Sequence, residues 1–503
     1  MGFIKKHLQI LVPAATILLY LFTRIYNILA IPIFTDEAIY VRWAQIAGTD
    51  PKERFISLTD GKQPTFVWLS AFAMRIIRDP LLAGRLVSVF AGLGSLVGIY
   101  VLTTEIFKNR KTGIIAGLIY LIYPFSMVYD KLALYDSLVS MFIIWSLYFE
   151  ILLVRRIRLD IALILGMIMG GGMLTKTSND FALILLPFSL LLFNFKEKLW
   201  KKNLLKWAVL ALISVVIANV IYSILRLSPY FYIIAQKNAT FVYPFREWLT
   251  HPFTFFAGNI RGLSGWLIEY LTIPFALLIV SAFFVDKKNL RKKIFLFVWF
   301  ISPFMVLALF GKVIYPRYIL FMTMPLLVLG AYSIYVLLSK LKSNSQKFLV
   351  LLAFISVMLW KDYFILTDIS KAPIPASDRF QLIESWPSGV GVKETINFLY
   401  EKSKTGKIYV GTEGTFGLMP YSLEIYLKDN PNIKTVGFWP MSAVPPKEVL
   451  DSAKKIPTYF VFYQPCSVCP ATGVAPKSWP VSKVFQIKKQ EVGSFYTLYK
   501  INQ

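Results

Sequence analysis

The chain has 503 residues, of which 56% are hydrophobic and only 16% charged, and its mean hydropathy is +0.59. Soluble globular proteins carry about 25% charged residues, so this composition excludes a disordered chain, a secreted disulfide scaffold and an ordinary cytosolic enzyme. The 54 basic and 28 acidic residues give a net charge of +26, but the basic residues gather in short runs between apolar stretches, which favours a polytopic membrane protein over nucleic-acid binding.

The first apolar stretch follows Lys5, Lys6 and His7 and extends to about residue 31. It lacks a convincing cleavage site for a secretory signal, so we interpret it as a retained span. A membrane-spanning helix needs about 20 apolar residues. Ten later stretches complete a prediction of eleven spans: 82–107, 112–129, 136–154, 159–175, 179–195, 204–226, 264–285, 294–310, 316–338 and 347–366.

The linkers between these stretches alternate in character. One set is short and basic, and it lies at 108–111, 155–158, 196–206, 287–293 and 340–347. The positive-inside rule predicts that this set is cytoplasmic, together with the N-terminus. The other set, including the aromatic-rich linkers 32–81 and 227–263 and everything after about 367, is then extracytoplasmic. Within it, Glu37–Ile46 and Pro64–Arg78 predict short amphipathic helices on the outer membrane surface.

Beyond the last apolar stretch the pattern becomes that of a soluble α/β domain. Lys407–Gly411 and Thr458–Tyr463 predict strands, and Val392–Ser403 and Pro446–Lys455 predict helices. We therefore expect a transmembrane module over residues 1–370 and an extracytoplasmic α/β domain over residues 371–503.

The two cysteines, Cys466 and Cys469, fall in this second domain. With only two histidines in the chain, no Cys/His zinc cluster can be built. A disulfide suits an extracytoplasmic location, whereas a redox motif would be followed by a helix. Pro465 and Pro470 flank the pair, so we favour the disulfide.

Ionisable residues at the extracytoplasmic ends of the spans are the candidates for a functional site. Asp36 either caps a helix that starts at Glu37, or acts as a general base whose pKa is raised by partial desolvation. Lys62 either anchors the helix that starts at Pro64 at the interface, or neutralises a phosphate leaving group.

Three later positions add to this set. Asp136, which shares a short motif with Lys131, either caps the fourth span or faces Asp36 across a cavity and binds sugar hydroxyls. Lys176 lies in a tight hairpin after three glycines that allow close helix packing. Arg317, next to Tyr318, either snorkels to the interface or binds a phosphate.

Linker 227–263 adds four further candidates for the site, and each can equally be a solvated surface charge. They are Lys237, Arg246, His251 and Arg261. The whole set maps to one membrane face and suits a lipid phosphate, a sugar and an attacking hydroxyl. One base suffices for such a transfer, because a phosphate leaving group needs cations rather than a proton donor.

These motifs resemble the GT-C superfamily of membrane glycosyltransferases, in the branch of the dolichyl-phosphate-mannose–protein mannosyltransferases and the bacterial lipid A aminoarabinose transferase. The resemblance covers about residues 1–340. It rests on Asp36-Glu37-Ala38-Ile39-Tyr40, Gly61-Lys62-Gln63-Pro64, Ala83-Gly84-Arg85-Leu86-Val87-Ser88, Leu134-Tyr135-Asp136-Ser137, Leu174-Thr175-Lys176-Thr177 and Tyr315-Pro316-Arg317-Tyr318-Ile319-Leu320.

The resemblance implies an inverting transfer of a monosaccharide from a polyprenyl-phosphate donor to a hydroxyl of a lipid, glycan or protein at the outer face. It implies Asp36 as the base that activates the acceptor hydroxyl. We also expect that Glu37 tunes this base and that no cofactor is required. The donor phosphate and sugar would be held by Lys62, Lys131, Asp136, Lys176, Lys237, Arg261, Arg317 and Tyr318.

The sequence also departs from this family. Gln63 stands where the family often has a second proline, and residues 235–241 lack the histidine and arginine of the aminoarabinose branch. A divalent metal is therefore possible but unsupported. The alternatives are a lipid-linked sugar transporter or flippase, which predicts inverted repeats and charges deep in the spans, and a non-catalytic assembly protein of the cell envelope.

Overall fold

The computed structural model describes residues 2–502, with side chains from residue 11 onward. The chain divides into two compact units. The first comprises Met1–Asn27, Lys52–Leu69 and Arg85–Pro375, and the second comprises Ile28–Pro51, Ser70–Gly84 and Ala376–Gln503. Two parts of the predicted linker 32–81 therefore belong to the same unit as the C-terminal region.

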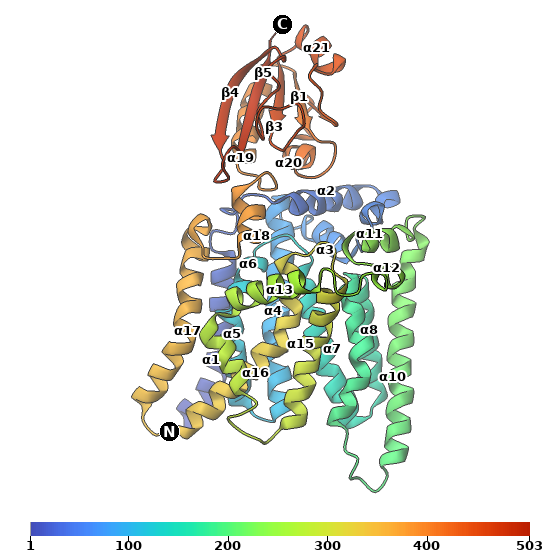
Figure 1. Ribbon diagram of the computed structural model, residues 1–503, viewed down its shortest axis with the longest axis vertical. Helices are drawn as coiled ribbons and strands as arrows, with labels where there is room; N and C mark the ends of the chain where they lie inside the picture. Colours follow the sequence, from blue (N-terminus) through green and yellow to red (C-terminus); the bar gives the residue numbers. More distant parts are fainter. Residues whose placement is uncertain (1, 503) are drawn as a thin grey trace. The chain divides into compact units, whose positions relative to one another are not determined.

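The first unit is built from apolar helices, drawn from blue to gold in Figure 1. Its longer helices are α1 (Gly2–Ile25), α4 (Pro80–Phe107), α5 (Arg110–Leu121), α7 (Asp136–Arg156), α8 (Leu159–Met173), α10 (Trp200–Tyr222), α13 (Phe256–Leu271), α15 (Leu290–Phe310), α16 (Leu320–Lys340) and α17 (Asn344–Thr367). Its short elements are η1 (Pro51–Glu53), η2 (Ile56–Asp60), α3 (Thr65–Ala73), α6 (Pro124–Tyr129), η3 (Thr177–Asp180), α9 (Phe181–Leu185), η4 (Leu186–Leu192), η5 (Ser223–Leu227), α11 (Ile233–Phe241), α12 (Phe245–Trp248), α14 (Ile273–Ser281), η6 (Pro316–Ile319) and η7 (Ile369–Lys371).

Within residues 2–502, six helices are long and apolar enough to cross a membrane, and the number rises to seven if the pair α13 and α14 is one span bent by 97°. Shorter apolar helices occur at Leu11–Ile25, Leu159–Met173 and Thr177–Leu192. The chain is thus a multi-pass membrane protein, while eleven spans stays a prediction. Prolines break two predicted spans, because a proline disfavours helical geometry in the residue before it. Pro124 begins α6 after a break in 112–129, and Thr272 (φ 68°) lies at the bend in 264–285, two residues before Pro274.

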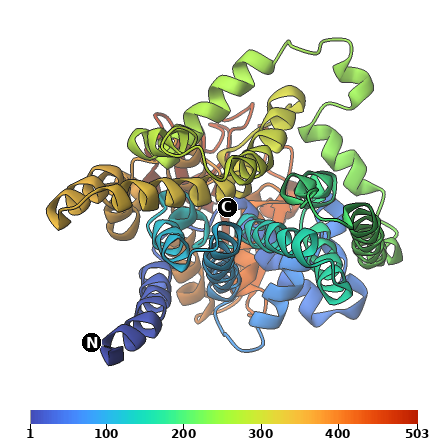
Figure 2. The same ribbon diagram turned by 90° about the horizontal axis from the view of Figure 1, so that it is seen from below.

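Helix α16 lies at the centre of the first unit, where α5, α7, α14 and α15 pack around it. Of its most apolar stretch, 89% is buried, against 22% for the span that contains α10 and 17% for α17. Figure 2 shows α10 and α17 at opposite edges of this bundle. Such exposed apolar helices suit contact with lipid chains.

The second unit contains a five-stranded sheet of order β2-β1-β3-β5-β4. Strand β1 (Ile408–Glu413) pairs in parallel with β2 (Ile433–Phe438) and β3 (Thr458–Phe462), and β5 (Phe495–Ile501) pairs antiparallel with β3 and β4 (Val481–Lys488). The helices of this unit are α2 (Thr35–Thr49), α18 (Ala376–Arg379), η8 (Phe380–Glu384), α19 (Val392–Ser403), α20 (Leu418–Leu427) and α21 (Lys447–Ala453). One core face is formed by Tyr409, Met441, Val449, Ala453, Phe460, Phe462, Ala475, Trp479, Tyr499 and Ile501.

Helix α2, expected on the membrane surface, packs against α20 within the second unit. Arg42 Nε lies 2.8 Å from Glu424 Oε2, and Gln45 Nε2 donates to the Ile425 carbonyl oxygen at 2.9 Å. Its residues from Glu37 to Ala44 are buried. This part of the chain therefore gains its order from residues nearly 400 positions away.

The predicted disulfide between Cys466 and Cys469 is present. It closes a turn after β3, in which the Cys469 amide donates to the Cys466 carbonyl oxygen at 3.3 Å. Both half-cystines are half-buried against the hydrophobic core of the sheet.

Candidate functional site

Cations and aromatic rings of the first unit gather in a set that we call the cation cluster, formed by Lys62, Lys176, Lys237, Arg317, Phe241, Tyr315 and Tyr318. Lys62 Nζ and Lys237 Nζ lie 5.1 and 5.8 Å from the centre of the Phe241 ring. Lys176 Nζ lies 4.7 Å from the centre of the Tyr318 ring. The guanidinium carbon of Arg317 lies 4.9 Å from the Tyr315 ring and 5.8 Å from the Tyr318 ring. The Phe241 and Tyr318 rings meet edge to face at 6.2 Å, which joins the two halves of the cluster.

Each cation is held by a helical element or its end. Lys62 follows η2, whose last cap is Gly61 in the left-handed conformation at φ 66°. Lys176 is the residue before η3, Lys237 lies within α11, and Arg317 follows the proline that begins η6. Four segments that are distant in sequence thus supply the cluster, as the sequence analysis expected for Lys62, Lys176 and Arg317.

Lys176 is paired with Asp136, whose Oδ1 lies 2.9 Å from Lys176 Nζ. Asp136 is the first residue of α7 and is only 6% exposed. A carboxylate in the first turn of a helix interacts favourably with the helix dipole, and the lysine supplies the counter-charge that a buried carboxylate requires. The pair therefore fixes a buried carboxylate beside the cluster.

Hydrogen bonds and a second ion pair join the segments around Lys237. Lys237 Nζ contacts Asp60 Oδ1 at the end of η2. The Thr177 hydroxyl accepts from Gln63 Nε2 at 2.8 Å and from Asn238 Nδ2 at 3.2 Å. Gln63, which replaces an expected proline, thus joins the residues after η2 to η3, while Asn238 joins α11 to η3.

Two predicted ligands lie outside the cluster. Lys131 is 1% exposed, and its Nζ donates to the Tyr26 carbonyl oxygen at 2.8 Å, so it secures the end of α1. Arg261 is exposed on α13. The sequence places these cations on the expected face but does not tell whether the side chain points to a ligand or to the backbone.

Asp36 and Glu37 belong to the second unit, in the first turn of α2. The helix starts at Thr35, two residues before the predicted start, and its N-cap residue is Phe34, so Asp36 is not the cap. Glu37 takes part in capping instead, because its Oε2 accepts from the Phe34 amide at 2.9 Å. Glu37 is fully buried, whereas Asp36 is half-buried.

A buried polar network around Asp130 was missed in the sequence. Asp130 accepts hydrogen bonds from the hydroxyls of Tyr20 at 3.0 Å, Tyr120 at 3.2 Å and Ser137 at 2.7 Å, and Arg24 Nε lies 3.7 Å away. The signal was Arg24 within the first apolar stretch, since a charge at that depth needs a buried partner. This network packs α1 against α4 and the residues that precede α7.

The cation cluster can bind an anion that also offers an apolar or sugar surface. Lysine and arginine side chains attract phosphate, although Lys176 and Lys237 also pair with Asp136 and Asp60 here. The tyrosine and phenylalanine rings present flat apolar faces. Among the residues that the structure describes, the single close group of three metal-ligating side chains is Glu413, Cys466 and Cys469, in the second unit rather than in the cluster.

Comparison with known protein families gives a match to part of the chain. Residues 61–222 match the family model described as dolichyl-phosphate-mannose-protein mannosyltransferase. Searching the curated proteins with this sequence gives no match.

Solved structures match over nearly the whole chain. ArnT from Cupriavidus metallidurans in the apo state has a TM-score of 0.61 at 12% identity, with 99% of this chain and 98% of that chain covered. The same protein bound to undecaprenyl phosphate gives 0.56 at 14% identity, over 98% and 97% of the two chains. The oligosaccharyltransferase AglB from Archaeoglobus fulgidus, with an inhibitory peptide and a dolichol-phosphate, gives 0.55 at 13% identity, over 91% and 69%.

The family model begins at Gly61 and includes Lys62, Asp136 and Lys176 of the predicted site. The structural likeness extends the match to the second unit, including its C-terminal sheet. The family match over residues 61–222 and the likeness in fold to ArnT both support the resemblance drawn from the sequence.

Proposed function

We propose that this protein is a membrane glycosyltransferase that moves a monosaccharide from a polyprenyl phosphate to a hydroxyl of a lipid, glycan or protein at the extracytoplasmic face, with inversion. The observation that carries the proposal is the cation cluster, in which Lys62, Lys176 and Arg317 converge from separate segments of a GT-C fold. Two proteins of similar fold support it, since ArnT was solved with undecaprenyl phosphate bound and AglB with a dolichol-phosphate.

The chemistry assigns distinct tasks to these side chains. The glycosyl phosphate bond breaks with its electron pair moving to the phosphate oxygen, and Lys62 and Arg317 stabilise that charge without donating a proton. Asp136, held by Lys176, accepts hydrogen bonds from sugar hydroxyls. Asp36 takes the proton of the acceptor hydroxyl as it attacks the anomeric carbon from the opposite face.

Binding of undecaprenyl phosphate to the purified protein in nanodiscs tests the phosphate assignment. A charge-assisted contact to phosphate is worth about 1.5–3 kcal/mol, so Lys62→Ala and Arg317→Ala each weaken binding by about 10- to 100-fold. Lys198→Ala is the matched control, because Lys198 is an exposed lysine outside the cluster. Unchanged affinity in both cluster variants would remove the phosphate site.

The base assignment needs a separate measurement. Mass spectrometry of surface lipids and glycoproteins from cells with and without the protein identifies the product, and transfer is then assayed with that acceptor. Asp36→Asn keeps the shape of the side chain, so we expect undecaprenyl phosphate binding to persist while turnover falls at least about 100-fold. Near-normal turnover would contradict the assignment of Asp36 as the base.

A further inference from the structure

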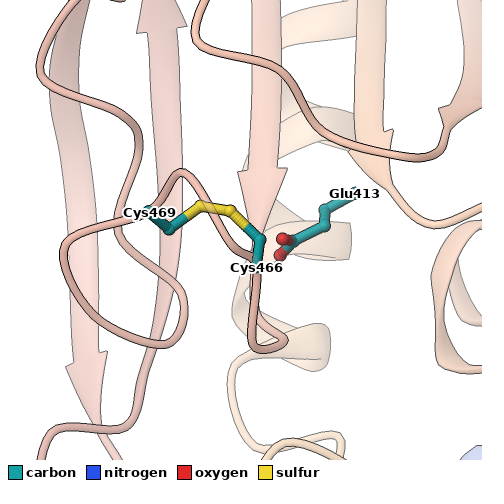
Figure 3. Close-up of side chains that lie close together, drawn as sticks. All are labelled: Glu413, Cys466 and Cys469. Atoms are coloured by element: carbon teal, nitrogen blue, oxygen red, sulfur yellow. A yellow bond between two sulfur atoms is a disulfide. The ribbon is translucent and has the colours of Figure 1, made fainter.

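The disulfide of the second unit lies beside a buried carboxylate (Figure 3). Glu413 is the last residue of β1, and Cys466 and Cys469 lie in the turn that follows the neighbouring parallel strand β3. One carboxylate oxygen and the two sulfurs all lie within 4.8 Å of one another. The proposed transfer reaction does not use this group.

One carboxylate oxygen of Glu413 accepts hydrogen bonds, and the other has no partner among the described residues. The Glu413 side chain is fully buried, and its Oε2 accepts from the Tyr463 and Gln464 amides, both at 2.9 Å. Its Oε1 is buried and has no hydrogen-bond partner among the described residues. Leaving a buried carboxylate oxygen unpaired is unfavourable and calls for an explanation. The two amides fix the orientation of the carboxylate, as outer hydrogen bonds do for a metal ligand.

We propose that reduction of the Cys466–Cys469 disulfide creates a site for a thiophilic divalent cation such as Zn²⁺, with both thiolates and Glu413 as its ligands. Two sulfurs and one oxygen leave the fourth tetrahedral position open for water or a second ligand. Zinc–sulfur bonds of about 2.3 Å and zinc–oxygen bonds of about 2.1 Å place tetrahedral ligand atoms about 3.6–3.8 Å apart. Each of the three ligand atoms therefore reaches that tetrahedral geometry by a shift of about 1 Å.

The chemistry requires an external reductant, which is a dithiol or a phosphine. A dithiol attacks one sulfur, the bond between Cys466 and Cys469 breaks, and the dithiol closes its own disulfide, which leaves two protein thiols. Zn²⁺ then displaces the two thiol protons, because the thiolate is the metal ligand. The half-buried cysteines allow the ion to enter. An external disulfide reverses the exchange: it accepts two electrons and becomes two thiols, the bond between Cys466 and Cys469 forms again, and the ion is released. Occupancy of the site therefore reports the redox state.

Cobalt titration of the full-length protein in detergent tests this inference. The protein, purified without a histidine tag, is reduced with a phosphine, freed of reductant without oxygen and titrated with Co²⁺. We expect one equivalent to bind with thiolate-to-metal charge-transfer absorption and the visible bands of tetrahedral cobalt, and Zn²⁺ to displace it. The oxidised protein is the control for binding at other residues, and we expect no such spectrum from it.

Variants decide which side chains are ligands. Cys466→Ser abolishes the charge-transfer band or at least halves it, and Glu413→Gln weakens Co²⁺ binding at least about tenfold while keeping a two-thiolate spectrum. Absence of a tetrahedral spectrum in the reduced wild type at micromolar Co²⁺ would overturn the site. Equal affinity of Glu413→Gln and wild type would remove Glu413 from it. Thermal melting of both variants in the reduced, metal-free state, beside the reduced wild type, distinguishes lost ligation from lost folding.

Discussion

Replacing Gly61 by alanine should disturb the cation cluster without touching any of its charges. Gly61 has φ 66°, and a Cβ built there lies 2.5 Å from Lys237 Cβ and 2.8 Å from the Ile233 carbonyl oxygen. Non-bonded carbon atoms prefer about 3.5–4.0 Å, so α11 has to retreat by about 1–1.5 Å. Lys62 Nζ is 5.1 Å from the Phe241 ring at the end of α11, and such a shift takes it beyond the useful cation–π range of about 6 Å.

The size of the effect follows from three contributions. The left-handed conformation costs alanine about 1–2 kcal/mol. The ion pair of Lys237 with Asp60, whose side chains are 28% and 25% exposed, contributes about 0.5–1 kcal/mol after solvent screening, and the cation–π contact contributes about as much. A total of about 2–4 kcal/mol lowers the melting temperature by several degrees. About half of it falls on the cluster and weakens undecaprenyl phosphate binding by about tenfold.

Both quantities are measured on purified protein, by thermal melting and by titration with undecaprenyl phosphate. Gly262→Ala in α13 is the control, because a Cβ there meets nothing within 4 Å, and helical alanine is neutral or slightly stabilising. Gly61→Asn separates the causes, since asparagine tolerates the left-handed region but carries the same Cβ. If Gly61→Ala kept both the melting temperature and the affinity of the wild type, the close approach of α11 would not organise the cluster.

Two further predictions concern stability. A Cβ on Gly92 would lie 2.1 Å from Tyr20 Oη and 2.4 Å from Asp130 Oδ2, so Gly92→Ala should break buried hydrogen bonds and destabilise the protein by about 3 kcal/mol in thermal melts. Gly117→Ala is the control and should leave the melting temperature unchanged, because a Cβ there meets nothing within 4 Å. Equal melting temperatures of the two variants would contradict the packing around Gly92. Burial raises the pKa of Glu413 to about 7, against the lowering effect of hydrogen bonds from two backbone amides, so the folded protein keeps a proton that the unfolded chain releases near pH 4.3. The stabilisation that this retained proton gives the folded protein is complete below pH 4 and is lost as the pH rises to 7. The melting temperature of Glu413→Gln, which does not titrate, should therefore rise relative to wild type between pH 5 and pH 8. A difference in melting temperature that stays constant with pH would contradict the raised pKa of Glu413.

The sequence predicted site residues best where a charged residue lies on the membrane face that usually lacks such charges. Lys62, Lys176 and Arg317 could be predicted to share a site because each cation lies in or next to a linker on the face where lysine and arginine are not expected. The aromatic side of the cluster was less predictable, because phenylalanine and tyrosine are common throughout such a chain. Phe241 acquires its place only when α11 packs against η2.

Other features depended on contacts that no local pattern reveals. The role of Glu37 follows from where α2 starts, and helix starts are uncertain by one or two residues. Strands β4 and β5 carry polar residues on both faces and escaped the strand prediction, whereas α19 was predicted with its observed bounds. The packing of α2 on α20 joins residues 382 positions apart, as between Arg42 and Glu424, and is beyond periodicity arguments.

The discontinuity of the second unit has a consequence for biosynthesis. Residues 28–51 leave the ribosome early, but α20 and the sheet follow only after the roughly 290 residues between Gly84 and Ala376. Leu418, where α20 begins, follows Thr49 by 369 positions, so at about 5–20 residues per second α2 waits about 20–75 s for the surface that covers it. During that interval its apolar side chains need a lipid headgroup layer or a chaperone as a temporary shelter.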